Sequence, residues 1–130
     1  MNRILLLLLF FFNLTCFSQT QAEMNKDAYA ALNEADKKLN EVYQKILIEY
    51  KEDVTFVKSL KNVQRIWIQF RDAELEMKYP NYTDSYYGLS YPMCSAIYLK
   101  ELTEERTDKL TIWLKGIEEV DMCSGSIKTN

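Results

Sequence analysis

The chain has no histidine and only 3 cysteines among its 130 residues. Histidine is the commonest general base near neutral pH and the commonest metal ligand, so its absence argues against most acid–base enzymes and metal sites. The cysteines are also too few for a closed structural zinc site. We therefore expect no metal, no other cofactor and no enzymatic activity.

Residues that interrupt helices are scarce as well, with 3 glycines and 2 prolines. This scarcity favours a chain that is mostly helical. The net charge is −3, an acidic balance that argues against nucleic acid or an anionic membrane surface as partner. It is compatible with a basic protein partner.

The N-terminus has the pattern of a secretory signal. Arg3 precedes the apolar run Ile4–Phe12, which is long enough for a signal peptide and far too short to span a bilayer. Small residues at Cys16 and Ser18 predict cleavage after Ser18, so residues 1–18 are interpreted as a signal peptide. The alternative is a lipoprotein signal with Cys16 as the lipidated residue. Either signal predicts an exported protein, periplasmic or extracellular.

Two cysteines, Cys94 and Cys123, remain after this cleavage. An even number of cysteines in an exported protein favours a disulfide between them. A straight helix from residue 94 to 115 would hold the two thiols far apart. The bond therefore requires a break in that helix, and Thr103 is a candidate N-cap for a second piece beginning after Leu102.

The first expected helix covers residues 23–50, where apolar residues recur at alternating steps of four and three. A short polar turn follows, with Asp53 as the N-cap of a second helix that ends at Tyr79, before Pro80. The expected buried seam of the first helix consists of Ala28, Leu32, Ala35, Leu39, Val42, Ile46 and Tyr50. The expected buried stripe of the second consists of Leu60, Val63, Trp67, Phe70, Ala73 and Met77, bordered by Gln64, Arg71 and Glu74.

The third expected helix starts near Pro92 and ends at Gly116. Its expected inward residues are Ile97, Leu102, Arg106, Leu110, Trp113 and Leu114. Together these patterns predict an all-α fold, a small bundle of three main helices whose first two form an antiparallel hairpin. The expected domain is residues 19–123, followed by a loose tail at 124–130.

Residues 79–92 form the one long irregular segment and hold five of the 9 tyrosines. Tyrosine is enriched at binding surfaces because it gives a large contact area at low entropic cost. One interpretation is a recognition loop, and the other is that the rings cover the end of the bundle. The candidate partner-binding residues are Tyr82, Asp84, Tyr86, Tyr87 and Tyr91.

A set of polar and aromatic residues makes the chain recognisable. The set is Asp36, Asn40 and Tyr43, then Gln64, Trp67, Arg71 and Asp72 within the motif QRxWxxFRDAE, and Arg106 in the run LTEER. Over about residues 20–115 this pattern resembles the LprI-type lysozyme inhibitor domain, a family of small exported bacterial proteins. The resemblance implies an all-α fold and a protein that binds lysozyme.

The sequence departs from that family at two positions. Many members carry cysteine where Asp27 and Leu75 stand here. The family's usual bond to the cysteine at position 94 therefore cannot form, and Cys123 is the remaining candidate partner.

The polar residues of the motif allow two interpretations. In one, Asp36, Arg71, Asp72 and Glu74 form a contact surface. In the other, Arg71 pairs with a carboxylate such as Asp36, while Asn40 and Gln64 satisfy buried groups. Asp72 and Glu74 point to different faces of a helix, so they cannot flank one substrate as an acid and base pair.

Two functions remain at this point. The first is inhibition of a muramidase by an acidic, tyrosine-bearing loop that occludes the sugar-binding cleft, with lysozyme or another basic protein as partner. The second is a structural or envelope-stress accessory domain whose protein partner is not lysozyme.

Overall fold

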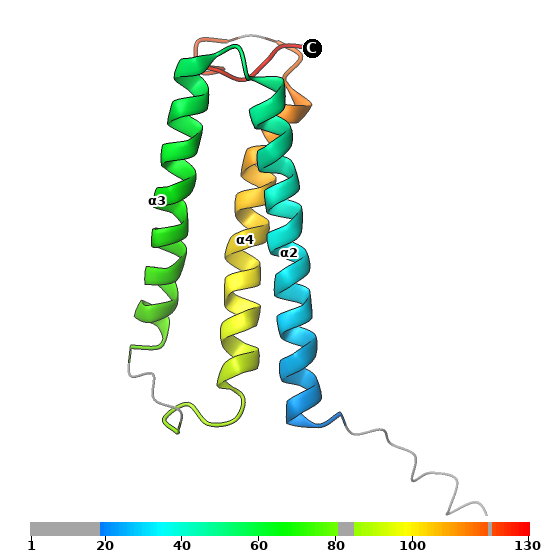
Figure 1. The fold of residues 1–130 in the computed structure, drawn as a ribbon, viewed down its shortest axis with the longest axis vertical. Coiled ribbons are helices and arrows are strands. Elements are labelled where there is room, and N and C mark those ends of the chain that lie inside the picture. The colour runs from blue at the N-terminus through cyan, green and yellow to red at the C-terminus, as the bar shows by residue number, and fades with distance from the viewer. Residues whose placement is uncertain (1–18, 81–84, 120) are drawn as a thin grey trace, which may run out of the picture.

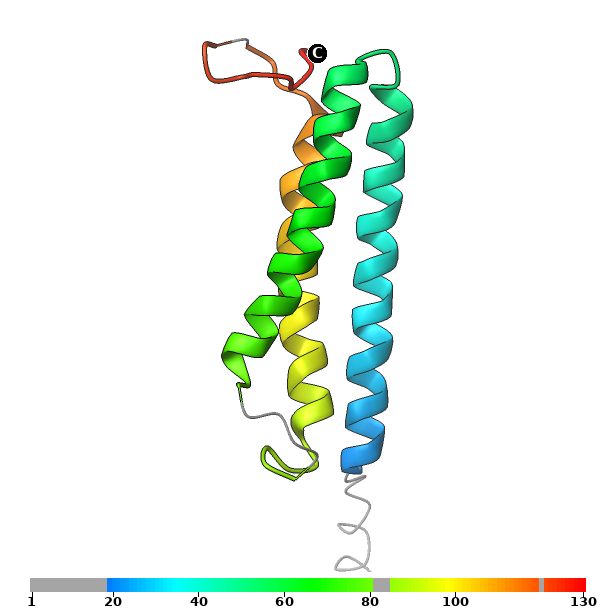
Figure 2. The same ribbon diagram turned by 60° about the vertical axis from the view of Figure 1, so that its left-hand side comes forward.

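The computed structural model describes residues 19–80, 85–119 and 121–130. These residues form three long helices, α2 (Gln21–Glu49), α3 (Val54–Lys78) and α4 (Tyr91–Lys115), with one isolated bridge between Ile117 and Thr129. Helices α2 and α4 run in the same direction, and α3 runs opposite to both (Figures 1 and 2). The predicted all-α bundle is confirmed. The expected signal peptide, residues 1–18, lies outside the described residues.

The helix ends follow local sequence signals. Thr20 and Glu23 form a reciprocal capping box at the start of α2. The side chain of Asp53 accepts a hydrogen bond of 2.9 Å from the backbone N–H of Phe56, as its predicted N-cap role requires. Gly116 ends α4 at a φ of 71°, a conformation that favours glycine.

The predicted seam of α2 is confirmed, and it packs mainly on α4. Ile46 is fully buried in a core cluster with Leu39, Leu60 and Leu110. A second cluster nearer the start of α2 is built on small residues such as Ala96, which let the two helices approach closely. The closest helix pair is therefore α2 with α4. A hairpin of α2 and α3 as the main packing unit is not confirmed, although those two helices are antiparallel.

The predicted buried stripe of α3 is confirmed at Leu60 and Trp67 and is wrong at its other four positions. Phe70 is 53% exposed and Met77 67% exposed, and Val63 and Ala73 also face solvent. The residues that α3 turns inward are Leu60, Gln64 and Trp67, with Arg71 and Glu74 half-buried further along. These five positions also recur at helical spacing, so α3 had two candidate seams. The polar one faces the bundle because its side chains pair with polar groups on α2 and α4.

Helix α4 also differs from its prediction. It is continuous from Tyr91 to Lys115, so the proposed break near Leu102 does not occur, and Ile97 is 42% exposed instead of inward. The buried positions of α4 are Ser95, Ala96, Thr103 and Leu110. The Thr103 hydroxyl does not cap a new helix but donates to the carbonyl of Leu99 at 2.8 Å.

The unbroken α4 keeps the two cysteines apart. Cys94 lies in the first turn of α4, and the chain reaches Cys123 only after α4 has ended at Lys115. Both are free thiols in the structure, so the expected bond between them is not formed. The helix from residue 94 to 115 rises by about 32 Å, more than the eight following residues can span back.

The C-terminal segment folds back over the end of the bundle that carries the α2–α3 turn (Figure 1). The Tyr50 hydroxyl donates to the Trp113 carbonyl at 3.0 Å and accepts from the Lys128 backbone N–H at 3.1 Å. The indole N–H of Trp113 donates to Ser126 at 3.0 Å. These bonds connect residues 126 and 128 to Trp113 and Tyr50, and the loose tail expected for residues 124–130 stays a prediction.

Candidate functional site

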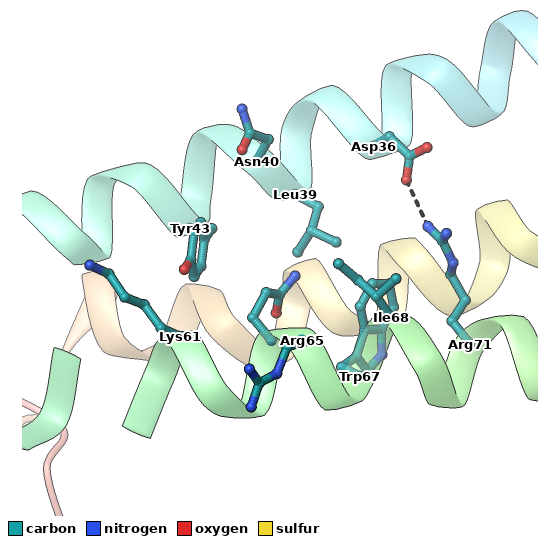
Figure 3. Close-up of a pocket in the computed structure, with 10 residues that line it drawn as sticks. Asp36, Leu39, Asn40, Tyr43, Lys61, Arg65, Trp67, Ile68 and Arg71 are labelled. Atoms are coloured by element: carbon teal, nitrogen blue, oxygen red, sulfur yellow. Dashed lines mark hydrogen bonds and ion pairs between the residues drawn. The ribbon is translucent and has the colours of Figure 1, made fainter. Parts of the chain in front are cut away.

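The residues of the recognised motif line an open groove between α2 and α3 of about 390 Å³. Figure 3 shows Tyr43 and Leu39 pointing from α2 towards α3, which supplies the opposite wall. The lining residues are Asp36, Leu39, Asn40, Tyr43, Lys61, Gln64, Arg65, Trp67, Ile68 and Arg71. The sequence had predicted contact between these helices but not a groove.

An ion pair closes one end of the groove. Nη1 of Arg71 lies 3.3 Å from Oδ1 of Asp36 across the two helices (Figure 3). The same guanidinium bonds Asp72 at 2.9 Å and lies 5.5 Å from the centre of the Trp67 ring. Two carboxylates therefore compensate the charge of Arg71. The structural interpretation of Arg71 and Asp36 is confirmed.

A second arginine lies behind the groove. Arg106 of α4 donates from Nε to Oε1 of Gln64 at 3.1 Å, and its guanidinium lies 6.0 Å from the Trp67 ring centre. Its Nη2 is buried and has no hydrogen-bond partner among the residues that the structure describes. Desolvation by burial lowers the pKa of Arg106. The buried role predicted for Gln64 is confirmed, whereas Asn40 is exposed and satisfies no buried group among residues 19–80, 85–119 and 121–130.

Three further lining residues, Lys61, Arg65 and Ile68, were not named as site residues from the sequence, although Arg65 is part of the motif QRxWxxFRDAE. All three are exposed, and Ile68 is 43% exposed. The spacing of Gln64, Trp67 and Arg71 puts those three residues on one helical face, and this spacing is the signal that could have identified their neighbours. Once that face is inward, Lys61, Arg65 and Ile68 must border it.

The tyrosine segment lies at the end of the bundle opposite the C-terminal segment (Figure 1). The rings of Tyr79, Tyr87 and Tyr91 contact one another, with centres 5.1 to 5.8 Å apart. Burial raises the pKa of Tyr79. These three rings thus cover the ends of α3 and α4, as the structural interpretation expected.

Two apolar side chains stay exposed beside that cluster. Tyr86 is 64% exposed, with its ring centre 4.8 Å from that of Tyr87, and Leu89 is 82% exposed. Tyr82 and Asp84, also predicted to bind a partner, lie outside the described residues. The described part of the segment therefore presents one tyrosine and one leucine on a base of packed aromatic rings.

Helices α3 and α4 are joined near this end by Tyr98. Its hydroxyl donates to Oε2 of Glu74 at 2.9 Å, and this bond raises the pKa of Tyr98. The Lys78 ammonium lies 3.7 Å from the centre of the same ring. Glu74 is thus occupied by a structural contact, as is Asp72 through Arg71.

Residues 19–80, 85–119 and 121–130 contain no group of three or more cysteine, aspartate or glutamate side chains placed to hold a metal ion. None of the helices in this described part is long and apolar enough to cross a membrane.

The chain was compared with known protein families. Residues 16–110 match the family described as Lysozyme inhibitor LprI. The match covers more than half of the chain, and the chain belongs to this family. It is a family of inhibitors and not of enzymes. No curated protein and no solved structure matches the chain.

Proposed function

We propose that this protein is exported and inhibits a lysozyme-type muramidase by occluding the cleft that binds the sugar chain. Membership of the lysozyme inhibitor family over residues 16–110 is the observation that carries the proposal. An inhibitor of this kind needs a rigid scaffold and a few well-placed side chains, but no chemistry of its own. Three long helices with a closed core provide such a scaffold.

The bundle end with the tyrosine segment is the proposed inhibitory surface. Tyr86 and Leu89 are the described side chains that project there, and the packed rings of Tyr79, Tyr87 and Tyr91 hold their backbone in place. Tyrosine is among the residues enriched at the energetic centre of protein interfaces. The net charge of −3 favours encounter with a basic enzyme, because opposite charges speed association.

A paired substitution tests this surface. The variant Tyr86→Ala with Leu89→Ala removes the two exposed side chains. The matched control, Ile48→Ala with Val54→Ala, removes two similarly exposed side chains at the other end of the bundle. We expect the first variant to raise the half-inhibitory concentration against a muramidase by about tenfold or more. The control should inhibit as the wild-type protein does.

If both variants inhibit the muramidase equally, the tyrosine end is not the contact surface. If the wild-type protein itself does not inhibit a muramidase, the proposed inhibitor function is wrong. The remaining hypothesis is then a structural or envelope-stress accessory domain whose protein partner is not lysozyme.

A further inference from the structure

The groove between α2 and α3 carries an excess of positive charge. From Val54 to Arg71, helix α3 has the basic residues Lys58, Lys61, Arg65 and Arg71 and no acidic residue. This concentration occurs in a chain whose net charge is −3. Three of the four basic side chains line the groove, against the single carboxylate of Asp36.

That carboxylate does not compensate the other charges. Asp36 is paired with Arg71, which also holds Asp72. Within the described ranges, neither Lys61 nor Arg65 forms an ion pair, and Arg65 donates to the neutral amide oxygen of Asn62 at 2.7 Å. Lys61 and Arg65 are four residues apart on α3, so both side chains extend from the wall of the groove that this helix supplies.

A third cation, Arg106 of α4, lies behind the groove and adds to its positive electrostatic potential. Arg106 is held by the neutral oxygen of Gln64 and makes no ion pair within the part of the chain that the structure describes. Its Nη2 is shielded from solvent and lacks an acceptor there. A desolvated cation is screened less than one in water, so its attraction for an anion in the adjacent groove is stronger.

The remaining lining suits the body of a small molecule. Trp67 and Tyr43 are half-buried and line the groove from opposite helices, with Leu39 and Ile68 beside them (Figure 3). The volume of about 390 Å³ falls within the range of small-molecule sites. Apolar walls with a few charged groups at the rim are the usual composition of such sites.

We propose that the α2–α3 groove binds a small carboxylate-bearing ligand, about the size of one sugar ring. Lys61 and Arg65 bind the carboxylate, and Trp67 and Tyr43 contact the body of the ligand. The recognised chemistry is the carboxylate on a compact body, which an acidic sugar or a short acid can supply. This site is separate from the tyrosine end and does not depend on inhibition of a muramidase.

The indole N–H signals of the two tryptophans give a direct test in the intact protein by ¹H–¹⁵N NMR. Trp67 lines the groove, and Trp113 packs at the end of the bundle and serves as an internal control. The variant Trp113→Phe assigns the two signals. The probes are N-acetylmuramic acid, its neutral counterpart N-acetylglucosamine, and D-lactate, which carries the carboxylate without the sugar.

We expect N-acetylmuramic acid to shift the Trp67 signal in a saturable manner and to leave Trp113 unchanged, while N-acetylglucosamine shifts neither. The variant Lys61→Gln with Arg65→Gln should weaken this binding by about tenfold or more. The control Lys37→Gln with Lys109→Gln removes the same charge from exposed positions outside the groove and should bind as wild type. Added salt should weaken binding.

The outcomes separate the sources of the ligand. A Trp67 shift with both N-acetylmuramic acid and D-lactate supports the proposal and assigns recognition to the carboxylate alone. A shift with N-acetylmuramic acid only supports it and assigns a contribution to the sugar ring. The proposal is overturned if no acidic probe shifts Trp67, if the neutral sugar acts equally, or if the Lys61 and Arg65 variant binds as wild type.

Discussion

Gln64 on α3 accepts a hydrogen bond of 3.1 Å from Nε of Arg106 on α4, midway along both helices. Trp67, one turn further along α3, lies between the guanidinium groups of Arg106 and Arg71. These contacts orient α3, because rotating it to bury Phe70 would remove the acceptor that Gln64 provides for Arg106. The polar residues of the family motif therefore determine which face of α3 meets the rest of the bundle.

The first prediction concerns Gln64. Replacement Gln64→Leu leaves the buried Arg106 without its acceptor and should lower the free energy of unfolding by about 2 kcal/mol. The control Gln69→Leu changes an exposed glutamine of the same helix and should have an effect below about 0.5 kcal/mol. Urea denaturation followed by circular dichroism measures both.

A double mutant isolates the pair. Adding Arg106→Met to Gln64→Leu removes both polar partners, so the combined loss should be smaller than the sum of the two single losses. Strict additivity would show that Gln64 and Arg106 do not depend on each other.

The second prediction compares two aromatic residues of α3. Trp67 packs against the core cluster and contacts two guanidinium groups, so Trp67→Ala should destabilise the protein by about 2–4 kcal/mol. Phe70 is 53% exposed, and Phe70→Ala should cost less than about 1 kcal/mol. The ratio of the two losses reports which face of α3 is inward. A larger loss for Phe70 would restore the apolar stripe as the buried face.

The sequence predicted α2 well and α3 poorly for a physical reason. In α2, one stripe of small and aliphatic residues is the single apolar face, so periodicity determines what is buried. In α3, the stripe of Val63, Phe70 and Met77 and the series Gln64, Trp67 and Arg71 both have helical periods. Hydropathy favours the first, whereas the second is inward because of partners on other helices, which periodicity within one helix does not reveal.

The third prediction concerns the C-terminal segment. The Tyr50 hydroxyl joins the end of α4 to residue 128 through two hydrogen bonds, so Tyr50→Phe should cost about 1 kcal/mol and lower the melting temperature. Tyr29→Phe, at a position that is 48% exposed, is the matched control and should leave the melting temperature unchanged. Equal melting temperatures for both variants and the wild type would indicate that the segment is not attached through Tyr50.

The fourth prediction is that both cysteines of the protein purified without reductant react with an alkylating reagent. Cys123 is exposed and should react faster than the half-buried Cys94. Intact mass spectrometry after alkylation counts the modified thiols. A monomer that resists alkylation until reductant is added would contain the bond that the continuous α4 argues against.

The groove and the cysteines show what a single sequence leaves undetermined. The motif residues Asp36, Gln64 and Arg71 were identifiable from the sequence, and the pairing of Arg71 with Asp36 could be predicted from the cost of burying an unpaired charge. Lys61 and Arg65 were not named as site residues, because exposed basic residues on a helix have no distinguishing pattern, even though Arg65 stands inside the family motif. The disulfide was expected from export and an even cysteine count on the condition that the helix over residues 94–115 is broken, and the structure has that helix unbroken.

The central claim is that this member of the lysozyme inhibitor family inhibits a muramidase. The most direct measurement is the loss of turbidity of a peptidoglycan suspension with a fixed amount of muramidase and rising amounts of the protein. A parallel series uses an amidase that cleaves the peptide link of the same substrate. We predict that the muramidase slows until it is saturated and that the amidase is unaffected. Unchanged lysis by the muramidase at excess protein, or equal slowing of both enzymes, would contradict the claim.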